Sequence, residues 1–286
     1  MSPLGQHRSP ASVTPNARCE PGHRTQSMDA APRDSRADIL ARIRRAELEA
    51  ALTHIPPRST LLEIGGGSGW QASLLQHAGH LVVSVDLPTS RNRPRYFPVI
   101  NYDGRRLPFR TGSFSAVFSS NVLEHVENLD TLLLELDRVL APGGVCVHMV
   151  PTATWRIWTS LLHYPDMAHR AATRLFRGLR RHDEASERQP LVDSSFRLGH
   201  VLVEQPHGIS PSIFHEIWRF GRWSWVRTLT RPGYSAPKRF ATHLFYTGQL
   251  LVPTLSVAAR ERLGRMLGSS CVGFVLRKGG NCAREK

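Results

Sequence analysis

Cysteine, lysine and long apolar runs are all scarce in this chain. The four cysteines among 286 residues show no paired spacing, which argues against a disulfide framework and against a zinc site. No run reaches the roughly 18 apolar residues of a membrane-spanning helix. The polar, proline-bearing first residues lack the apolar core of a secretory signal. These absences predict a reduced, cytoplasmic protein without a metal site.

Acidic residues are also in the minority. Basic side chains number 37 and acidic ones 23, and the formal net charge is +14. The excess is uneven, because residues 36–151 contain 12 basic and 11 acidic side chains whereas residues 224–286 contain 11 basic and two acidic. A local excess of this kind attracts anions over about 8–10 Å, roughly one Debye length. Phospholipid headgroups and sugar phosphates qualify as partners, and nucleic acid ranks lowest because no RNA-binding module is recognisable.

Shifts in composition predict how the chain is organised. Residues 1–35 are rich in Ser, Pro, Arg and Ala, which predicts a disordered tail. One large α/β domain is expected over residues 36–286, since residues 59–150 contain five short apolar runs alternating with helical patterns. Residues 152–223 interrupt this pattern with an insertion rich in aromatic side chains, and residues 224–278 are expected to form strand, helix and strand. Apolar spacing predicts a first helix through Ile39, Leu40, Ile43, Leu48 and Leu52.

The most informative segment is residues 61–69, Leu-Leu-Glu-Ile-Gly-Gly-Gly-Ser-Gly. An apolar run containing Glu63 leads into glycines at alternate positions, and the next apolar run ends in Asp86. Strand, glycine turn, helix and acid-terminated strand form a nucleotide-binding half-unit, in which the acid can accept hydrogen bonds from ribose hydroxyls. The spacing differs from the Gly-x-Gly-x-x-Gly of dinucleotide sites, and Glu63 would repel a diphosphate. The segment therefore favours a methyl-donor cofactor over a dinucleotide.

Three more motifs follow in order. Residues 101–109 read Asn-Tyr-Asp-Gly-Arg-Arg-Leu-Pro-Phe, residues 113–126 end in Leu-Glu-His-Val, and residues 138–144 end in Pro-Gly-Gly. Together with the glycine turn, this series resembles the class I S-adenosylmethionine-dependent methyltransferases, in particular the type 11-like group. The resemblance covers residues 58–151. It implies a Rossmann-like, seven-stranded, mostly parallel sheet with helices on both faces and a helical, aromatic insertion after the fifth strand.

The resemblance also implies roles for matching residues, with S-adenosyl-L-methionine as the cofactor. Glu63 and the glycine turn would face its methionine part, Asp86 its ribose, and Asp103 with Gly104 its adenine. Asn121 would border the ammonium and methyl groups. One departure is Ser115, where relatives usually carry Asp in a structural role. The implied cofactor-binding residues are Glu63, Gly65, Gly67, Gly69, Asp86, Asp103, Gly104 and Asn121.

The catalytic base is left open by the residues. His125 is the candidate named for it, although a histidine on a helix is more often a packed or exposed ring. The other candidates are His148, His163 and His207. The expected reaction is direct methyl transfer to an oxygen of a glycan, a lipid-linked acceptor or another small molecule. A quinone or secondary-metabolite methyltransferase is the alternative, and a catalytically silent binding scaffold is an alternative of another class.

The insertion is expected to select the acceptor. Arg170, Arg174, Arg177 and Arg181 recur at helical spacing beside a stripe of Met, Ala and Leu. Such a helix can lie on an anionic membrane surface, clamp an acidic glycan or pack as a plain lid over the site. A helix on an anionic membrane surface would place the protein peripherally at the inner membrane face.

Overall fold

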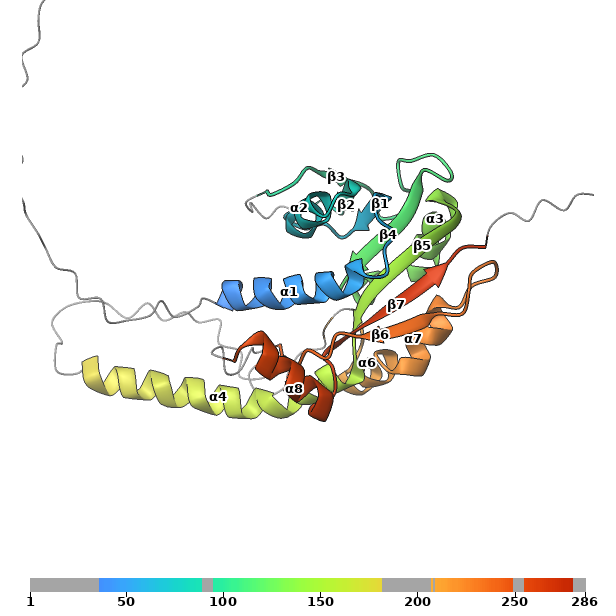
Figure 1. Ribbon diagram of the computed structural model, residues 1–286. Coiled ribbons are helices and arrows are strands. Elements are labelled where there is room, and N and C mark those ends of the chain that lie inside the picture. The colour runs from blue at the N-terminus through green and yellow to red at the C-terminus, as the bar shows by residue number, and fades with distance from the viewer. Residues whose placement is uncertain (1–35, 89–94, 182–206, 208, 249–254, 280–286) are drawn as a thin grey trace, which may run out of the picture. The chain divides into compact units, whose positions relative to one another are not determined.

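The apolar runs form the strands of one sheet in a computed structural model of the chain (Figure 1). The structure describes residues 36–88, 95–181, 207, 209–248 and 255–279. Seven strands lie in the order β3-β2-β1-β4-β5-β7-β6. They are β1 (Thr60–Ile64), β2 (Leu81–Asp86), β3 (Val99–Asn101), β4 (Phe114–Ser120), β5 (Leu140–Pro151), β6 (Lys238–Ala241) and β7 (Cys271–Arg277). The expected disordered tail, residues 1–35, lies outside the described residues.

The sheet is parallel from β1 to β5 and antiparallel at β7. Leu61 of β1 pairs with Val82 of β2 on one side and with Ala116 of β4 on the other, all in parallel register. Strand β7 runs antiparallel to both β5 and β6. The predicted Rossmann-like, mostly parallel architecture is confirmed. Its consequence is that β1 to β5 end at one common edge.

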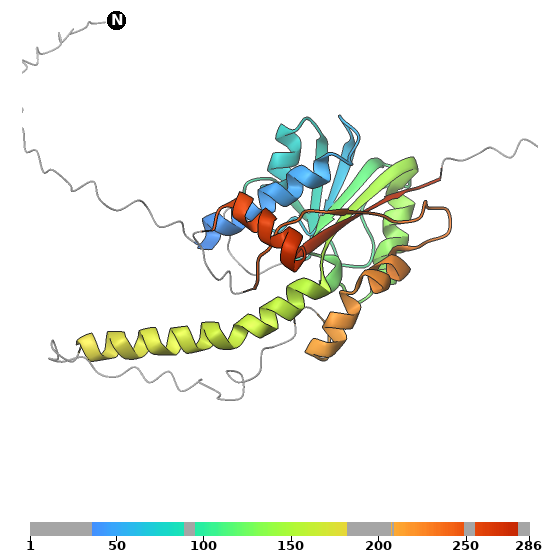
Figure 2. The same cartoon turned by 60° about the horizontal axis from the view of Figure 1, so that its bottom comes forward.

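Helices cover both faces because strand residues alternate between two cores. On one face, Leu61 and Phe118 pack with α1 (Arg36–Leu52) and α2 (Trp70–His77). On the other, Leu62 and Val117 pack with α3 (Leu129–Val139) and α7 (Arg222–Leu229). Helix α8 (Val257–Leu267) contacts α1, and Figure 2 shows the two helices beside each other. Alternation at period two is what a sheet buried on both faces requires.

Helix α1 forms where the apolar spacing predicted it. Ile39, Ile43 and Leu48 are buried, whereas Leu40 is 39% exposed. The strand expected at the start of residues 224–278 is not found there, because residues 224–229 are helical in α7. The reason is that Trp225 and Leu229, four residues apart, are both buried on one helical face. The strand expected in this region begins instead at Lys238.

The segment after β5 is helical, as expected. It contains α4 (Ala153–Arg181) and α6 (Ile213–Arg219), joined by a buried ion pair in which Arg156 Nε lies 2.9 Å from Glu216 Oε2. The side chains of Arg170, Arg174, Arg177 and Arg181 lie outside the described residues, so the expected basic face stays a prediction. None of the described helices has the length and apolarity needed to cross a membrane.

The close approach of α8 to the preceding chain gives a stability test. A Cβ on Gly264 would overlap the backbone carbonyl oxygen of His243, which has no flexible atom that can move away. Gly→Ala within a helix ordinarily stabilises by about 1 kcal/mol, so any loss must come from this overlap. We expect Gly264→Ala to lower the free energy of unfolding by about 1–3 kcal/mol in urea titrations. Met266→Ala, at an 80% exposed position of the same helix, is the control. A stabilised Gly264→Ala protein would contradict the packing.

Candidate functional site

A cleft lies at the common edge where the parallel strands end. The strand order reverses between β1 and β4, and open α/β sheets bind ligands in the crevice at such a switch point. The cleft has a volume of about 570 Å³, within the usual range for small-molecule sites. Its walls include Gly65, Asp86, Leu87, Tyr102, Asp103, Gly104, Asn121, Val122 and His125. The structure therefore brings most of the residues implied by the resemblance to one place.

The glycine turn after β1 is tied to the end of β2. The N–H groups of Gly65 and Gly66 both donate to the carbonyl of Val85, at 2.8 and 3.1 Å. Gly65 has a φ of 75°, and a Cβ there would overlap the side chain of Val122. Gly67 and Gly69 also have positive φ but are not among the cleft residues. The alternate glycines thus serve the path of the turn, and Gly65 also forms part of the wall.

Asp86 is held in place and still has acceptor capacity. Its Oδ2 accepts the N–H of Gly67 at 2.7 Å, and its Oδ1 accepts the N–H of Leu87 at 2.7 Å. A carboxylate oxygen has two lone pairs, so each oxygen can take one more hydrogen bond from the cleft. This is the arrangement that two neighbouring hydroxyl groups require.

Asp103 combines a turn role with an open oxygen. Its Oδ1 accepts the N–H groups of Arg105 and Arg106, both at 2.9 Å, and these bonds lower the pKa of its carboxyl. No described residue donates to Oδ2. Beside it, burial and the charges of Asp86 and Asp103 raise the pKa of Tyr102. An ionised carboxylate next to a neutral phenol and a glycine can hold a flat ring that carries an amino group.

Asn121 sits at the end of β4 in a left-handed conformation, with a φ of 54°. Its backbone N–H donates to Met149 at 2.9 Å, and its side-chain amide donates to Ser120 Oγ at 3.1 Å. Behind it, Cys271 Sγ lies 3.6 Å from Asn121 Oδ1 and 3.1 Å from the carbonyl of Val150. Asn121 is therefore fixed from both β5 and β7.

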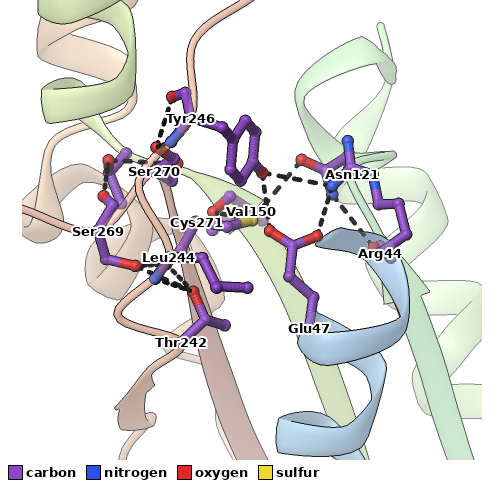
Figure 3. A network of polar contacts seen from close by, with 12 residues as sticks. Arg44, Glu47, Asn121, Val150, Thr242, Leu244, Tyr246, Ser269, Ser270 and Cys271 are labelled. Atoms are coloured by element: carbon purple, nitrogen blue, oxygen red, sulfur yellow. Dashed lines mark hydrogen bonds and ion pairs between the residues drawn. The ribbon is translucent and has the colours of Figure 1, made fainter. Parts of the chain in front are cut away.

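A buried polar network supports this wall (Figure 3). Glu47 of α1 is fully buried, and its two oxygens accept from Tyr246 Oη and from Arg44, both at 2.7 Å. The Ser270 hydroxyl holds Tyr246 in turn. It accepts the backbone N–H of Tyr246 at 2.8 Å and donates to the backbone carbonyl of Tyr246 at 2.6 Å. Because buried polar groups without partners are costly, these bonds fix α1 against β7.

Glu63 does not line the cleft. It is 2% exposed, and its Oε2 accepts the hydroxyl of Ser84 at 2.5 Å. Burial raises the pKa of this carboxyl to about 7. Its predicted contact with the methionine part of the cofactor stays a prediction. Its buried position next to the glycine turn indicates that it stabilises the turn. Ser115 is structural, as expected, since its hydroxyl accepts the N–H of Thr60 at 3.0 Å.

His125 stands at the cleft wall in a single 3-10 turn, Leu123–His125, which is shorter than the helix expected here. Its ring centroid lies 4.7 Å from that of His207, which in turn lies 5.1 Å from Trp155. Burial and Arg219 lower the pKa of His125, and burial lowers that of His207 to about 4. Burial also raises the pKa of the neighbouring Glu124 carboxyl to about 7. Both imidazoles are thus neutral near pH 7.

The remaining histidine candidates lie away from the cleft walls. His148 is buried in β5, where its Nδ1 lies 2.8 Å from Ser119 Oγ, and burial lowers its pKa to about 4. His163 packs its ring against Tyr164 on α4. The cleft also contains residues that the motifs did not single out, among them Leu87 and Tyr102. Their signal was positional, since each directly neighbours an acid at a strand end.

The comparisons with known proteins concern mainly the sheet. Residues 62–148 match the family model described as a methyltransferase domain. Over 145 residues the chain is 33% identical to an uncharacterized methyltransferase of Mycobacterium sp. (strain KMS), covering 45% of this chain and 54% of that protein. Over 113 residues it is 31% identical to a demethylmenaquinone methyltransferase of Streptomyces griseus, covering 37% of this chain and 49% of that protein. The chain thus spans about half the length of these relatives.

Among solved structures, an S-adenosylmethionine-dependent methyltransferase from Mesorhizobium loti aligns over 82% of this chain and 98% of that chain, with 16% identity and a TM-score of 0.46. The family match, the motifs and the sheet order agree on one class. Residues 62–148 are therefore similar to a methyltransferase domain.

The buried Glu63 carboxyl predicts a pH-dependent stability. Its folded pKa lies above the ordinary value of 4.5, so its contribution is fully present below pH 4.5 and is lost as pH rises through about 7. Between these limits the free energy of unfolding of the wild-type protein should fall by about 3 kcal/mol because of Glu63, as the pKa shift implies. Glu63→Gln should not show this fall. Urea unfolding at pH 5, 6.5 and 8 should show the variant gaining on the wild-type protein as pH rises.

Glu135→Gln is the matched control. The guanidinium of Arg138 lowers the pKa of Glu135, so this carboxyl is ionised in both states throughout that range. The free energy of unfolding of Glu135→Gln should therefore change with pH in parallel with that of the wild-type protein. Parallel curves for Glu63→Gln as well would show that Glu63 is ionised in the folded protein.

Proposed function

We propose that the chain transfers the methyl group of S-adenosyl-L-methionine to a small acceptor bound beside Asn121 and His125. The observation that carries this proposal is the cleft itself, which places the second-strand acid, the Asp-Gly loop and the fourth-strand amide around one volume of about 570 Å³. Because the family match covers only part of the chain and of its relatives, the activity of the whole protein is our inference.

The residues present fit this cofactor. Asp86 can accept two hydroxyl donors, and Asp103 Oδ2 can accept an amino group. Leu87 and Tyr102 offer apolar and aromatic surface for a base, and Leu87 is 52% exposed although it is apolar. The cofactor supplies a methyl group already activated on a sulfonium. What remains for the protein is to align the acceptor at near-attack distance and to exclude water.

His125 can serve as the base in this reaction. Its depressed pKa leaves the imidazole neutral near pH 7, so it can accept a proton from an acceptor hydroxyl. Its ring lies at the wall of the cleft, 45% of the side chain being exposed. Its exposure at the cleft wall and its lowered pKa both support this role.

For the acceptor, we propose an oxygen of a glycan, a lipid-linked molecule or another small compound, with a quinone or secondary metabolite as the alternative. The ring of His207 contacts those of His125 and Trp155, and such a group of rings beside the cleft suits a flat or lipophilic acceptor. The similarity to a demethylmenaquinone methyltransferase favours the quinone alternative.

We further propose that an anionic lipid surface is the partner of the helices beside the cleft. Residues 209–248 and 255–279 contain 11 basic and two acidic side chains; one of the acids, Glu216, is buried against Arg156. Large apolar side chains are nevertheless exposed: Phe214 84%, Trp218 67%, Trp223 73% and Met266 80%. Aromatic and basic side chains together are typical of helices that bind the interface of a membrane.

This surface lies near the strand edge that forms the cleft. Arg222, Arg239 and Arg265 line one groove with Thr152, which directly follows β5. The guanidinium of Arg222 stacks over the ring of Trp223 at 4.5 Å. A lipid-borne acceptor could therefore reach the cleft without leaving the membrane surface.

Donor binding tests the central proposal. Isothermal titration calorimetry of the wild-type protein should show one site for S-adenosyl-L-methionine, and Asp86→Ala should weaken it by about 1–3 kcal/mol because ribose hydrogen bonds are lost. Asp130→Ala, which removes a 91% exposed carboxylate, should bind as the wild-type protein does. Folded protein that binds no donor at high micromolar concentration would refute the proposal. Binding without methyl transfer to any acceptor fraction would favour the silent scaffold.

Vesicle binding tests the lipid surface. The wild-type protein should sediment with vesicles containing phosphatidylserine at low salt and be released at high salt, since the attraction is screened. Trp218→Ser combined with Trp223→Ser should weaken retention at least about tenfold through lost interfacial burial. Leu134→Ser, at a 62% exposed position on α3, is the control. Equal retention on neutral vesicles, or no effect of the two tryptophans, would contradict this surface.

A further inference from the structure

A buried carboxylate beside the cleft has no hydrogen-bond partner among the other described residues. Glu124 is 1% exposed, and no other described residue donates to either of its side-chain oxygens; its own backbone N–H is the one group that acts on it in this way. Leaving a buried carboxyl unpaired is costly. Glu47, by contrast, has both oxygens satisfied although it is just as buried. The exception at Glu124 therefore calls for a partner of another kind.

Two imidazoles converge on this carboxylate. His125 Nε2 lies 3.9 Å from Glu124 Oε1, and His207, which comes from the segment between α4 and α6, packs its ring against that of His125. One donor atom from each of the three side chains lies within 4.8 Å of the others. His207 is 82 residues from His125 in the sequence, so the fold rather than local spacing creates the cluster.

We propose that Glu124, His125 and His207 bind one divalent transition-metal ion of the zinc and iron(II) type. Two imidazole nitrogens and one carboxylate oxygen are the donor set that such ions prefer, and calcium or magnesium would require more oxygens. Ligands at about 2.0–2.2 Å from a tetrahedral ion lie roughly 3.4 Å apart.

The surrounding charges set the expected affinity. The charge of Arg44 acts on Glu124 and on His207, but Arg44 is paired with Glu47 at 2.7 Å. Arg156, whose charge acts on His207, is paired with Glu216. Arg219 acts on both Glu124 and His125, and no carboxylate among the described residues pairs with it. Its charge opposes a dication, so Arg219→Ala should tighten metal binding.

Three protein ligands leave a fourth position open, as in catalytic rather than structural zinc sites. This role rests on the proposed methyl transfer. A hydroxyl bound at that position would have a lowered pKa, which makes it a better nucleophile beside the methyl donor. His125 would then be a metal ligand in place of the base proposed above. The acceptor's proton would leave to water, and its oxygen would take the methyl group as the methyl–sulfonium bond breaks.

Cobalt(II) is the probe for this site. Protein without a histidine tag, dialysed against EDTA and then freed of it, should take up one Co²⁺ with a visible absorption band that Zn²⁺ displaces. His207→Ala and Glu124→Gln should each weaken uptake at least about tenfold. His77→Ala, which removes an exposed histidine at the end of α2, should leave it unchanged. The near-isosteric Glu124→Gln keeps the test valid if His207→Ala unfolds, as thermal melts will show.

The outcomes separate the two proposals. No one-to-one Co²⁺ uptake, uptake unaffected by Glu124→Gln, or weaker uptake in Arg219→Ala would overturn the metal site. Donor binding measured in EDTA would be unaffected by that failure. Conversely, metal uptake in a protein that binds no S-adenosyl-L-methionine would leave the metal site standing and remove its proposed role in methyl transfer.

Discussion

The hydrogen bond from the N–H of Gly67 to Oδ2 of Asp86 joins the two features on which the cleft depends. It ties the turn after β1 to the acid that ends β2, while the carbonyl of Val85 holds Gly65 and Gly66 beside it. Parallel pairing of β1 with β2 and β4 brings their ends to one edge. Without that pairing, the acid, the turn and Asn121 would point to different places. The chemistry of the cleft therefore begins with backbone register.

The class of protein was predictable because its signals are local. Strands β1 to β5 follow from apolar runs, and Asp86 follows from its position at a strand end. Asp103 and Asn121 follow from the resemblance, and His125 follows from its residue type within a motif. The predictions were weakest where a side chain's direction or a distant contact decides the outcome. Glu63 turns below the glycine turn rather than into the cleft, a choice that spacing does not encode. Residues 224–229 have the tryptophan and valine of a strand, but burial of Trp225 and Leu229 selects a helix.

The cluster beside the cleft shows the same limit. His207 was a candidate base from its residue type. Its neighbours are far away in the sequence, since His125 lies in the 3-10 turn after β4 and Trp155 lies at the start of α4. Nothing local marks Glu124 as buried, and the two arginines whose charges act on it, Arg44 and Arg219, lie on α1 and α6. The rings of this cluster meet through such long-range contacts. The acids of the cleft wall, by contrast, lie within short motifs.

Strand β7 has a consequence for how the molecule is made. This strand inserts between β5 and β6. In addition, Tyr246 donates a hydrogen bond to Glu47 of α1, which precedes it by 199 residues. Until β7 has been synthesised, one edge of β5 is unpaired. Until Tyr246 has been synthesised, Glu47 has only its partner within α1, Arg44. The sheet is therefore complete only after β7 has been synthesised. Until then, the open edge of β5 can pair with other chains, which makes the nascent protein a natural client of chaperones.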